Sequence, residues 1–208
     1  MPDPDTEAAS SASTASTSVS CLMVTRAKRF ELAQLAVQSF LRQTYTPRTL
    51  VVVHELEETP VPDDREKFAE RIIAYVTAQI PALPAKVGLR VMLVYSTTRS
   101  PISLAKLRNI ALESAPDNFV IQWDDDGQYH PRRIELQMEQ LLRVQPQTEQ
   151  REVCCCLTDQ LYFMQPTGKL YWIDWRRRGA QYMIPGTILT ECAGSRGHRP
   201  RGRELVLI

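Results

Sequence analysis

Residues 119–127 read FVIQWDDDG, an apolar run that ends directly in three aspartates and a glycine. Because side chains two apart in a strand point to the same side, we expect Asp124 and Asp126 to direct their carboxylates to one point and Asp125 to face elsewhere. Two such carboxylates suit a hard cation, Mg²⁺ or Mn²⁺, which also takes water and phosphate oxygens. The alternative is an acidic strand-to-loop turn, since Asp and Gly are common turn residues.

The rest of the chain repeats the order of strand and then helix. Apolar runs predict strands at 19–24, 50–53, 89–95 and 119–123, and apolar residues at helical spacing predict helices at 29–43, 64–80 and 132–142. A further helix is expected after Ser103, a suitable N-cap. This alternation predicts an α/β fold with a mostly parallel sheet and helices on both faces. Ligands bind such sheets at the carboxyl ends of strands, which is where the aspartates lie.

After Val144 the pattern changes to short β-rich segments. We expect strands at 153–157, 160–164 and 170–173, with a turn at 166–168 between the last two. Residues 179–184 and 185–189 add a last strand. A hairpin or meander therefore follows the α/β part.

Length and composition favour one soluble enzyme-sized domain. We expect a disordered tail at 1–18, a domain at 19–194 and an irregular basic tail at 195–208. A formal charge of +1 without a basic fold signature argues against nucleic-acid binding. No stretch approaches the length of a transmembrane segment, so we expect cytoplasmic residence, with attachment to a membrane surface left open.

Cysteines and tryptophans give weaker signals. Three of the five cysteines are consecutive, Cys154 to Cys156, which is no metal-ligand spacing, and we expect them to be small buried residues of a strand. Trp123 is expected in the core, whereas Trp172 and Trp175 could stack on sugar faces.

Several stretches together resemble the family 2 type of glycosyltransferases with the GT-A fold. They are residues 19–25, the pattern S-x-x-x-Q-x-Y at 39–45, the strand at 50–55, the segment SLAKLRN at 103–109, and WDDDGQYHP at 123–131, which includes the DxD motif. The joint spacing is far more specific than any one motif. The resemblance implies a nucleotide-diphosphate sugar donor, a Mn²⁺ or Mg²⁺ cofactor and a glycan, lipid or protein acceptor.

The resemblance also implies roles for individual residues. Asp124 and Asp126 would bind the metal, and Asp124 would also face the ribose or diphosphate. The implied nucleotide-sugar ligands are Thr25, Arg26, Glu55, Lys106, Arg108 and Asp124. Two positions depart from the family: His54 replaces one of an acidic pair, and Gly127 stands where a further Asp is common.

The mechanism implied is inverting transfer, in which a general base takes the proton of the acceptor hydroxyl. Glu191 is the nearest acidic candidate, although it also suits an ordinary polar position near a strand end. The family's C-terminal acidic pair is missing, so we expect a truncated or frame-altered end; His198 as a metal ligand is a minor option. The alternative function is a catalytically degenerate nucleotide-sugar-binding or interaction module. A nucleotidyltransferase is disfavoured, because residues 25–29 contain no glycine.

Overall fold

The computed structural model describes residues 17–26, 29–56, 63–79, 86–95, 101–144, 154–164, 166–174 and 187–191. The predictions for residues 1–16, for the strand at 179–184, for Trp175, for His198 and for the tail at 195–208 lie outside this part of the chain. Thr17 is bonded to the domain, since the Tyr45 hydroxyl donates to the Thr17 carbonyl.

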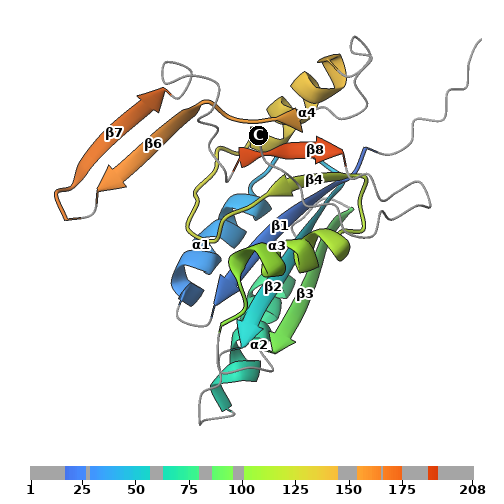
Figure 1. The fold of residues 1–208 in the computed structure, drawn as a ribbon, viewed down its shortest axis with the longest axis vertical. Helices are drawn as coiled ribbons and strands as arrows, with labels where there is room; N and C mark the ends of the chain where they lie inside the picture. Colours follow the sequence, from blue (N-terminus) through green and yellow to red (C-terminus); the bar gives the residue numbers. More distant parts are fainter. Residues whose placement is uncertain are drawn as a thin grey trace, which may run out of the picture.

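Six strands form one sheet in the order β3-β2-β1-β4-β8-β5 (Figure 1). β1 pairs in parallel with β2 and β4, β2 pairs in parallel with β3, and β8 runs antiparallel to β4 and β5. The mostly parallel α/β sheet that the sequence predicts is therefore confirmed. The strand bounds are Val19–Arg26 for β1, Arg48–Leu56 for β2, Val87–Tyr95 for β3, Phe119–Gln122 for β4, Cys154–Cys155 for β5 and Leu189–Glu191 for β8.

Helices cover both faces of the sheet, as predicted. The helices are α1 (Phe30–Leu41), α2 (Asp63–Gln79), α3 (Leu104–Glu113) and α4 (Arg133–Val144). One core joins α1, α2 and α4 to one face, and a smaller core joins α3 to the other, where Leu107 and Ala111 pack on Val53 of β2. Figure 1 shows α3 alone in front of the strands that it crosses.

The position of β1 creates the crevice. Because β1 has β2 on one side and β4 on the other, the order of the strands reverses there, and such a reversal opens a crevice at the carboxyl ends of the strands. Leu22 of β1 stands opposite Gln122 of β4, and the Trp123 N–H donates to the Leu22 carbonyl at 2.9 Å. The aspartates that follow Trp123 thus lie beside the end of β1.

β6 (Asp159–Met164) and β7 (Lys169–Asp174) form a separate two-stranded hairpin, as predicted, which projects from the body of the protein (Figure 1). Their pairing puts Leu161, Phe163, Leu170 and Trp172 on one face, and all four are exposed, Trp172 by 71%. Gly168 has φ of 62° in the connecting turn, a conformation that favours glycine.

Some boundaries differ from the prediction. β5 is only two residues long, and β8 begins at Leu189, where the sequence predicts that the strand ends. Cys154 is exposed and Cys155 and Cys156 are half-buried, so the prediction of buried cysteines is wrong, because β5 is the edge strand of the sheet. Among the described residues, no helix combines the length and apolarity needed to cross a membrane.

Candidate functional site

An aromatic anchor fixes the loop that carries the aspartates. The fully buried Trp123 donates its ring N–H to the Ala36 carbonyl at 3.0 Å and packs edge-on against Phe40 of α1. The prediction that Trp123 belongs to the core is therefore confirmed. The Tyr129 ring lies against Trp123, and its hydroxyl accepts the Asp124 N–H at 3.0 Å. Both ends of the aspartate loop are thus tied to the core.

Gly127 is explained by the same contact. A Cβ added at Gly127 would overlap the phenol of Tyr129, so the loop has no room for the aspartate that is common at this position in the resembling family. The acidic residues of this loop are therefore the three preceding aspartates.

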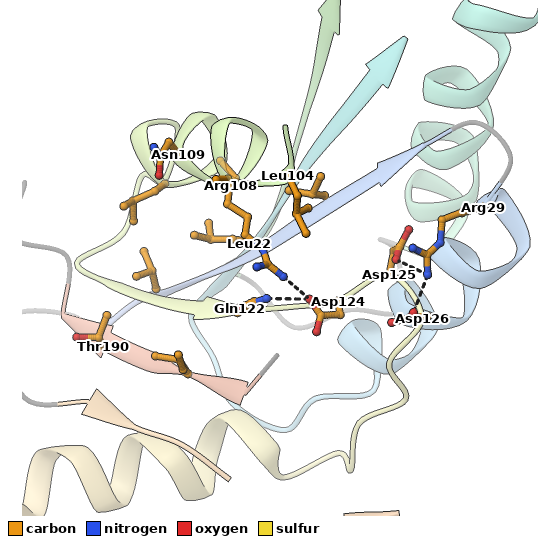
Figure 2. A pocket seen from close by; sticks show the side chains of 16 residues that line it. Leu22, Arg29, Leu104, Arg108, Asn109, Gln122, Asp124, Asp125, Asp126 and Thr190 are labelled. Atoms are coloured by element: carbon orange, nitrogen blue, oxygen red, sulfur yellow. Dashed lines mark hydrogen bonds and ion pairs between the residues drawn. The ribbon is translucent and has the colours of Figure 1, made fainter. Parts of the chain in front are cut away.

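The three carboxylates divide differently from the strand-alternation prediction. β4 ends at Gln122, and Asp125 and Asp126 lie in a turn in which the Gly127 N–H donates to the Asp124 carbonyl at 3.2 Å. Alternation therefore does not extend to Asp126. Asp125 is not turned away from its neighbours: a single nitrogen of Arg29, Nη2, lies 3.2 Å from its Oδ1 and 2.6 Å from Oδ2 of Asp126 (Figure 2).

Asp124 faces a different set of partners. Its Oδ1 accepts the Gln122 amide N–H at 2.9 Å and lies 3.6 Å from Nη2 of Arg108, which reaches over from α3 (Figure 2). Two arginines from different elements therefore flank the three carboxylates, one on each side.

Asp125 is the buried member of the cluster. Its side chain is 6% exposed, and burial raises the pKa of Asp125, against the lowering effects of the Thr25 hydroxyl and the Arg29 guanidinium. The Thr25 hydroxyl is its neighbour, yet neither Thr25 Oγ1 nor Asp125 Oδ2 makes a hydrogen bond of ordinary geometry, although both atoms are buried. A buried polar atom without a partner is costly, so a ligand that contacts Oδ2 would relieve this cost.

A cavity of about 640 Å³ opens beside the cluster. Its lining combines the three aspartates, Arg29 and Arg108 with apolar side chains such as Val24, Leu112, Val120 and Ile188. Its volume lies within the range of small-molecule sites. The cavity therefore offers both charged and apolar groups to one ligand.

Arg26 and Glu55, two of the predicted ligands, form a pair of their own. They stand opposite each other at the ends of β1 and β2, with Arg26 Nε 2.7 Å from Glu55 Oε2. The Glu55 carboxylate is 2% exposed and also accepts the Ile102 N–H, while Arg26 donates to the Ile102 carbonyl at 3.3 Å. Both side chains thus hold the segment before α3 against the sheet, and neither lines the cavity.

Lys106 and Arg108 differ although both belong to α3. Ser103 caps this helix as predicted, since its hydroxyl accepts the Lys106 N–H at 3.3 Å. The Lys106 side chain is exposed and does not line the cavity, whereas Arg108 does.

Glu191 is not brought to the carboxylates. It pairs with Phe119, the first residue of β4, so it lies at the end of that strand opposite Asp124. Asp124 lies five positions after Phe119, which corresponds to about 16 Å of extended chain. This separation exceeds the reach of a general base acting beside the aspartates.

Arg29 and Gln122 are the site residues that the sequence analysis missed. Gln122 could have been found, because it interrupts an otherwise apolar strand. Arg29 had a weaker signal: it begins a helix after β1, and only the pairing of β1 with β4 brings it to the aspartates.

The residues present suit a divalent cation that a substrate helps to bind. Within the described ranges no three His, Cys, Asp or Glu side chains are grouped as a complete metal site. Magnesium commonly takes one or two carboxylates and completes its shell with water and phosphates. The unpartnered, buried Asp125 Oδ2, next to the exposed Asp126 carboxylate, provides oxygen ligands of that kind.

Comparisons with known proteins give structural neighbours only. No family model and no curated protein matches the sequence. The structure of TarS 1-349 from S. aureus matches 85% of this chain and 47% of its own length, at 15% identity and a TM-score of 0.50. A complex of TarS 1-349 with UDP-GlcNAc matches 62% of this chain and 31% of its own, at 18% identity and a TM-score of 0.40.

The mannosyltransferase PcManGT from Pyrobaculum calidifontis, in complex with GDP-Man and Mn²⁺, matches 59% of this chain and 32% of its own at 21% identity and a TM-score of 0.41. The chain thus spans less than half the length of each of these structures. The broad match to TarS 1-349 concerns the fold, and it agrees with the predicted Rossmann-like α/β sheet of the GT-A type.

Proposed function

We propose that this chain forms the donor-binding part of an inverting glycosyltransferase of the family 2 type, which uses a nucleotide-diphosphate sugar and Mn²⁺ or Mg²⁺. The observation that carries this proposal is the cluster of Asp124, Asp125 and Asp126 between Arg29 and Arg108, all of which line the cavity. The cluster lies at the strand-order reversal of an α/β sheet, where ligands of such folds bind.

The charges of the cluster suit a diphosphate once a metal is present. A divalent cation added to three carboxylates and two arginines leaves a positive formal charge, which attracts an anionic diphosphate. Asp126 and Asp124 would hold the cation, with Asp125 as a third oxygen source. When bound, the cation would stabilise the negative charge of the departing diphosphate. Arg108 would contribute bidentate donors to the same phosphates.

The remaining predicted ligands of the nucleotide sugar have proposed roles as well. Thr25, at the end of β1, would face the ribose or base, and Lys106 would act from the exposed side of α3. Glu55 would act through Arg26, because its own carboxylate is already used by Arg26 and the Ile102 N–H. The acceptor, a glycan, lipid or protein, would approach the sugar from outside this set.

Calorimetry tests donor binding. UDP, GDP and their sugars are titrated into the protein with Mn²⁺ and again with EDTA, uridine nucleotides first because TarS structures hold UDP and UDP-GlcNAc. We expect binding that requires the metal and is lost in Asp124→Asn. The control Glu139→Gln alters an exposed carboxylate of α4 and should bind as the unmodified chain does. Metal-independent binding, or none with any nucleotide, would contradict the proposal.

A second candidate function is nucleotide-sugar binding without transfer. It is favoured by the position of Glu191, which is too far from the carboxylates to serve as the base there. Measuring nucleotide release from a bound donor sugar, with and without a panel of sugar and lipid acceptors, separates the two functions. Binding with no release in any mixture would favour the binding module.

A further inference from the structure

The Arg29 guanidinium lies between the carboxylates of Asp125 and Asp126 and contacts both. Its Nη2 lies 2.6 Å from Asp126 Oδ2 and 3.2 Å from Asp125 Oδ1, so one nitrogen bridges both groups. Figure 2 shows the guanidinium reaching from the start of α1 to both aspartates. The Arg29 side chain is 41% exposed, whereas the Asp125 side chain is 6% exposed. A long, partly exposed side chain therefore reaches a buried carboxylate.

We propose that Arg29 holds the place of the divalent cation in the metal-free protein, and that it must leave the carboxylates for the cation to bind. This inference rests on the proposed function, in which the aspartates are the metal site. Once released, Arg29 is available to bind the diphosphate of the donor. Binding of the metal and binding of the donor would therefore be coupled through the Arg29 side chain.

The need for a place holder follows from the charges. Three adjacent carboxylates repel one another. A cation between them offsets this repulsion. Arg29 is the cation that contacts Asp125 and Asp126 in the structure, while Arg108 approaches Asp124 at 3.6 Å.

Arg29 satisfies the site only in part. Asp125 Oδ2 and Thr25 Oγ1 are buried and make no hydrogen bond of ordinary geometry, even though Arg29 contacts the other oxygen of Asp125. The Thr25 hydroxyl, which belongs to β1 and is 2% exposed, is an observation independent of the acidic cluster that a further polar ligand belongs here. Asp125 and Asp126 would hold a divalent cation through the carboxylates that Arg29 contacts, so the two cations would compete for the same groups and repel each other.

Mn²⁺ titration without nucleotide tests the exchange. Free Mn²⁺ is followed by electron paramagnetic resonance in the unmodified chain and in Arg29→Gln, which removes the charge and keeps a polar side chain. The Arg29–Asp126 pair is exposed on both sides, and such a pair is worth at most about 1 kcal/mol, so we expect Arg29→Gln to bind Mn²⁺ about two- to fivefold more tightly. Arg29→Lys restores the charge and should return the affinity toward that of the unmodified chain.

Two matched controls separate the exchange from a general charge effect. Arg108→Gln removes an arginine from the same cavity that does not bridge two carboxylates, and Arg42→Gln removes an exposed arginine beyond the other end of α1. Both should raise Mn²⁺ affinity less than Arg29→Gln does. With Mn²⁺ present, Arg29→Gln should weaken UDP binding although the metal binds more tightly.

Each other outcome overturns the inference in a distinguishable way. If the unmodified chain binds Mn²⁺ and Arg29→Gln binds it equally or less tightly, Arg29 is not a place holder and the proposed function stands. If neither the unmodified chain nor Arg29→Gln binds Mn²⁺, both the place holder and the metal site are rejected. Circular dichroism of each variant, with the charge-retaining Arg29→Lys as reference, shows that the comparison is made between folded proteins.

Discussion

At the scale of the residue, Asp125 is the side chain whose direction in the structure differs most from the one predicted from the sequence. Strand alternation predicted that it faces away from Asp124 and Asp126, but β4 ends three residues earlier and a turn returns its carboxylate to the cavity. The aspartates as a group were predictable, because acidic residues directly after an apolar strand mark a ligand-binding edge. Their individual directions were not, since they depend on the Trp123 anchor and on Tyr129.

The first prediction concerns these two carboxylates. Asp125→Asn should lower Mn²⁺ affinity in the presence of UDP by about tenfold or more, at least as much as Asp126→Asn, because Asp125 carries the buried oxygen without a partner. Calorimetry of both variants, each checked for folding by thermal melting, gives the comparison. Metal binding that survives in Asp125→Asn but not in Asp126→Asn would favour the original alternation.

The second prediction concerns Cys21, a fully buried thiol of β1. Burial raises the pKa of Cys21 from 9.0 to about 12, so the unfolded chain loses this proton at lower pH than the folded protein does. The free energy of unfolding should therefore fall as pH rises above 9, with a contribution from Cys21 of about 1.4 kcal/mol between pH 8 and pH 10.

Urea unfolding at pH 8 and pH 10 measures this effect, with Cys21→Ala as the variant that lacks the thiol. The loss of stability between the two pH values should be smaller in Cys21→Ala by about the amount given above. An equal loss in both proteins would show that Cys21 ionises no differently in the folded chain.

At the scale of the element, the strands and helices of the first 144 residues were predicted well because hydrophobic periodicity reports directly which face is buried. The short strands β5 and β8 were predicted with shifted ends, because a strand of two or three residues is too short to show an alternation of apolar and polar residues. The roles of Glu55 and Arg29 depend on contacts between elements distant in sequence, which hydrophobic periodicity does not report.

The β6–β7 hairpin leads to the third prediction. Two strands with exposed faces are marginally stable alone, so its backbone amides should exchange with solvent much faster than those of β2, which lies inside the sheet. Hydrogen exchange followed by mass spectrometry compares peptides from residues 159–174 and 48–56. Equal protection would mean that the apolar face with Leu161 and Trp172 is covered in solution.

Glu191 of β8 gives the fourth prediction. Glu191→Gln should change neither metal-dependent nucleotide binding nor any sugar transfer, because the residue lies at the far end of β4 from the aspartates. The matched Asp124→Asn should abolish binding in the same assay. Transfer that is lost in Glu191→Gln while donor binding and folding persist would instead identify Glu191 as the base.

At the scale of the whole molecule, the sheet order brings the site together. The pairing of β1 with both β2 and β4 places the end of one strand beside the end of another that follows about a hundred residues later, and α3 adds Arg108 from the opposite face. The class of fold was predictable, since alternating strands and helices specify a parallel sheet that binds ligands at the carboxyl ends of its strands. The chain spans 47% of TarS 1-349, so the acceptor side of the proposed reaction is a separate question from donor binding.

The central claim is that a nucleotide and a divalent cation meet at Asp124, Asp125 and Asp126. Paramagnetic broadening by Mn²⁺ in nitrogen–proton correlation spectra, recorded with UDP present, locates the cation directly. The claim predicts that signals of residues 124–127, Thr25 and Arg29 broaden first, and that those of the hairpin at 159–174 stay sharp. Broadening that begins elsewhere, or that leaves the aspartate loop unaffected, would contradict it.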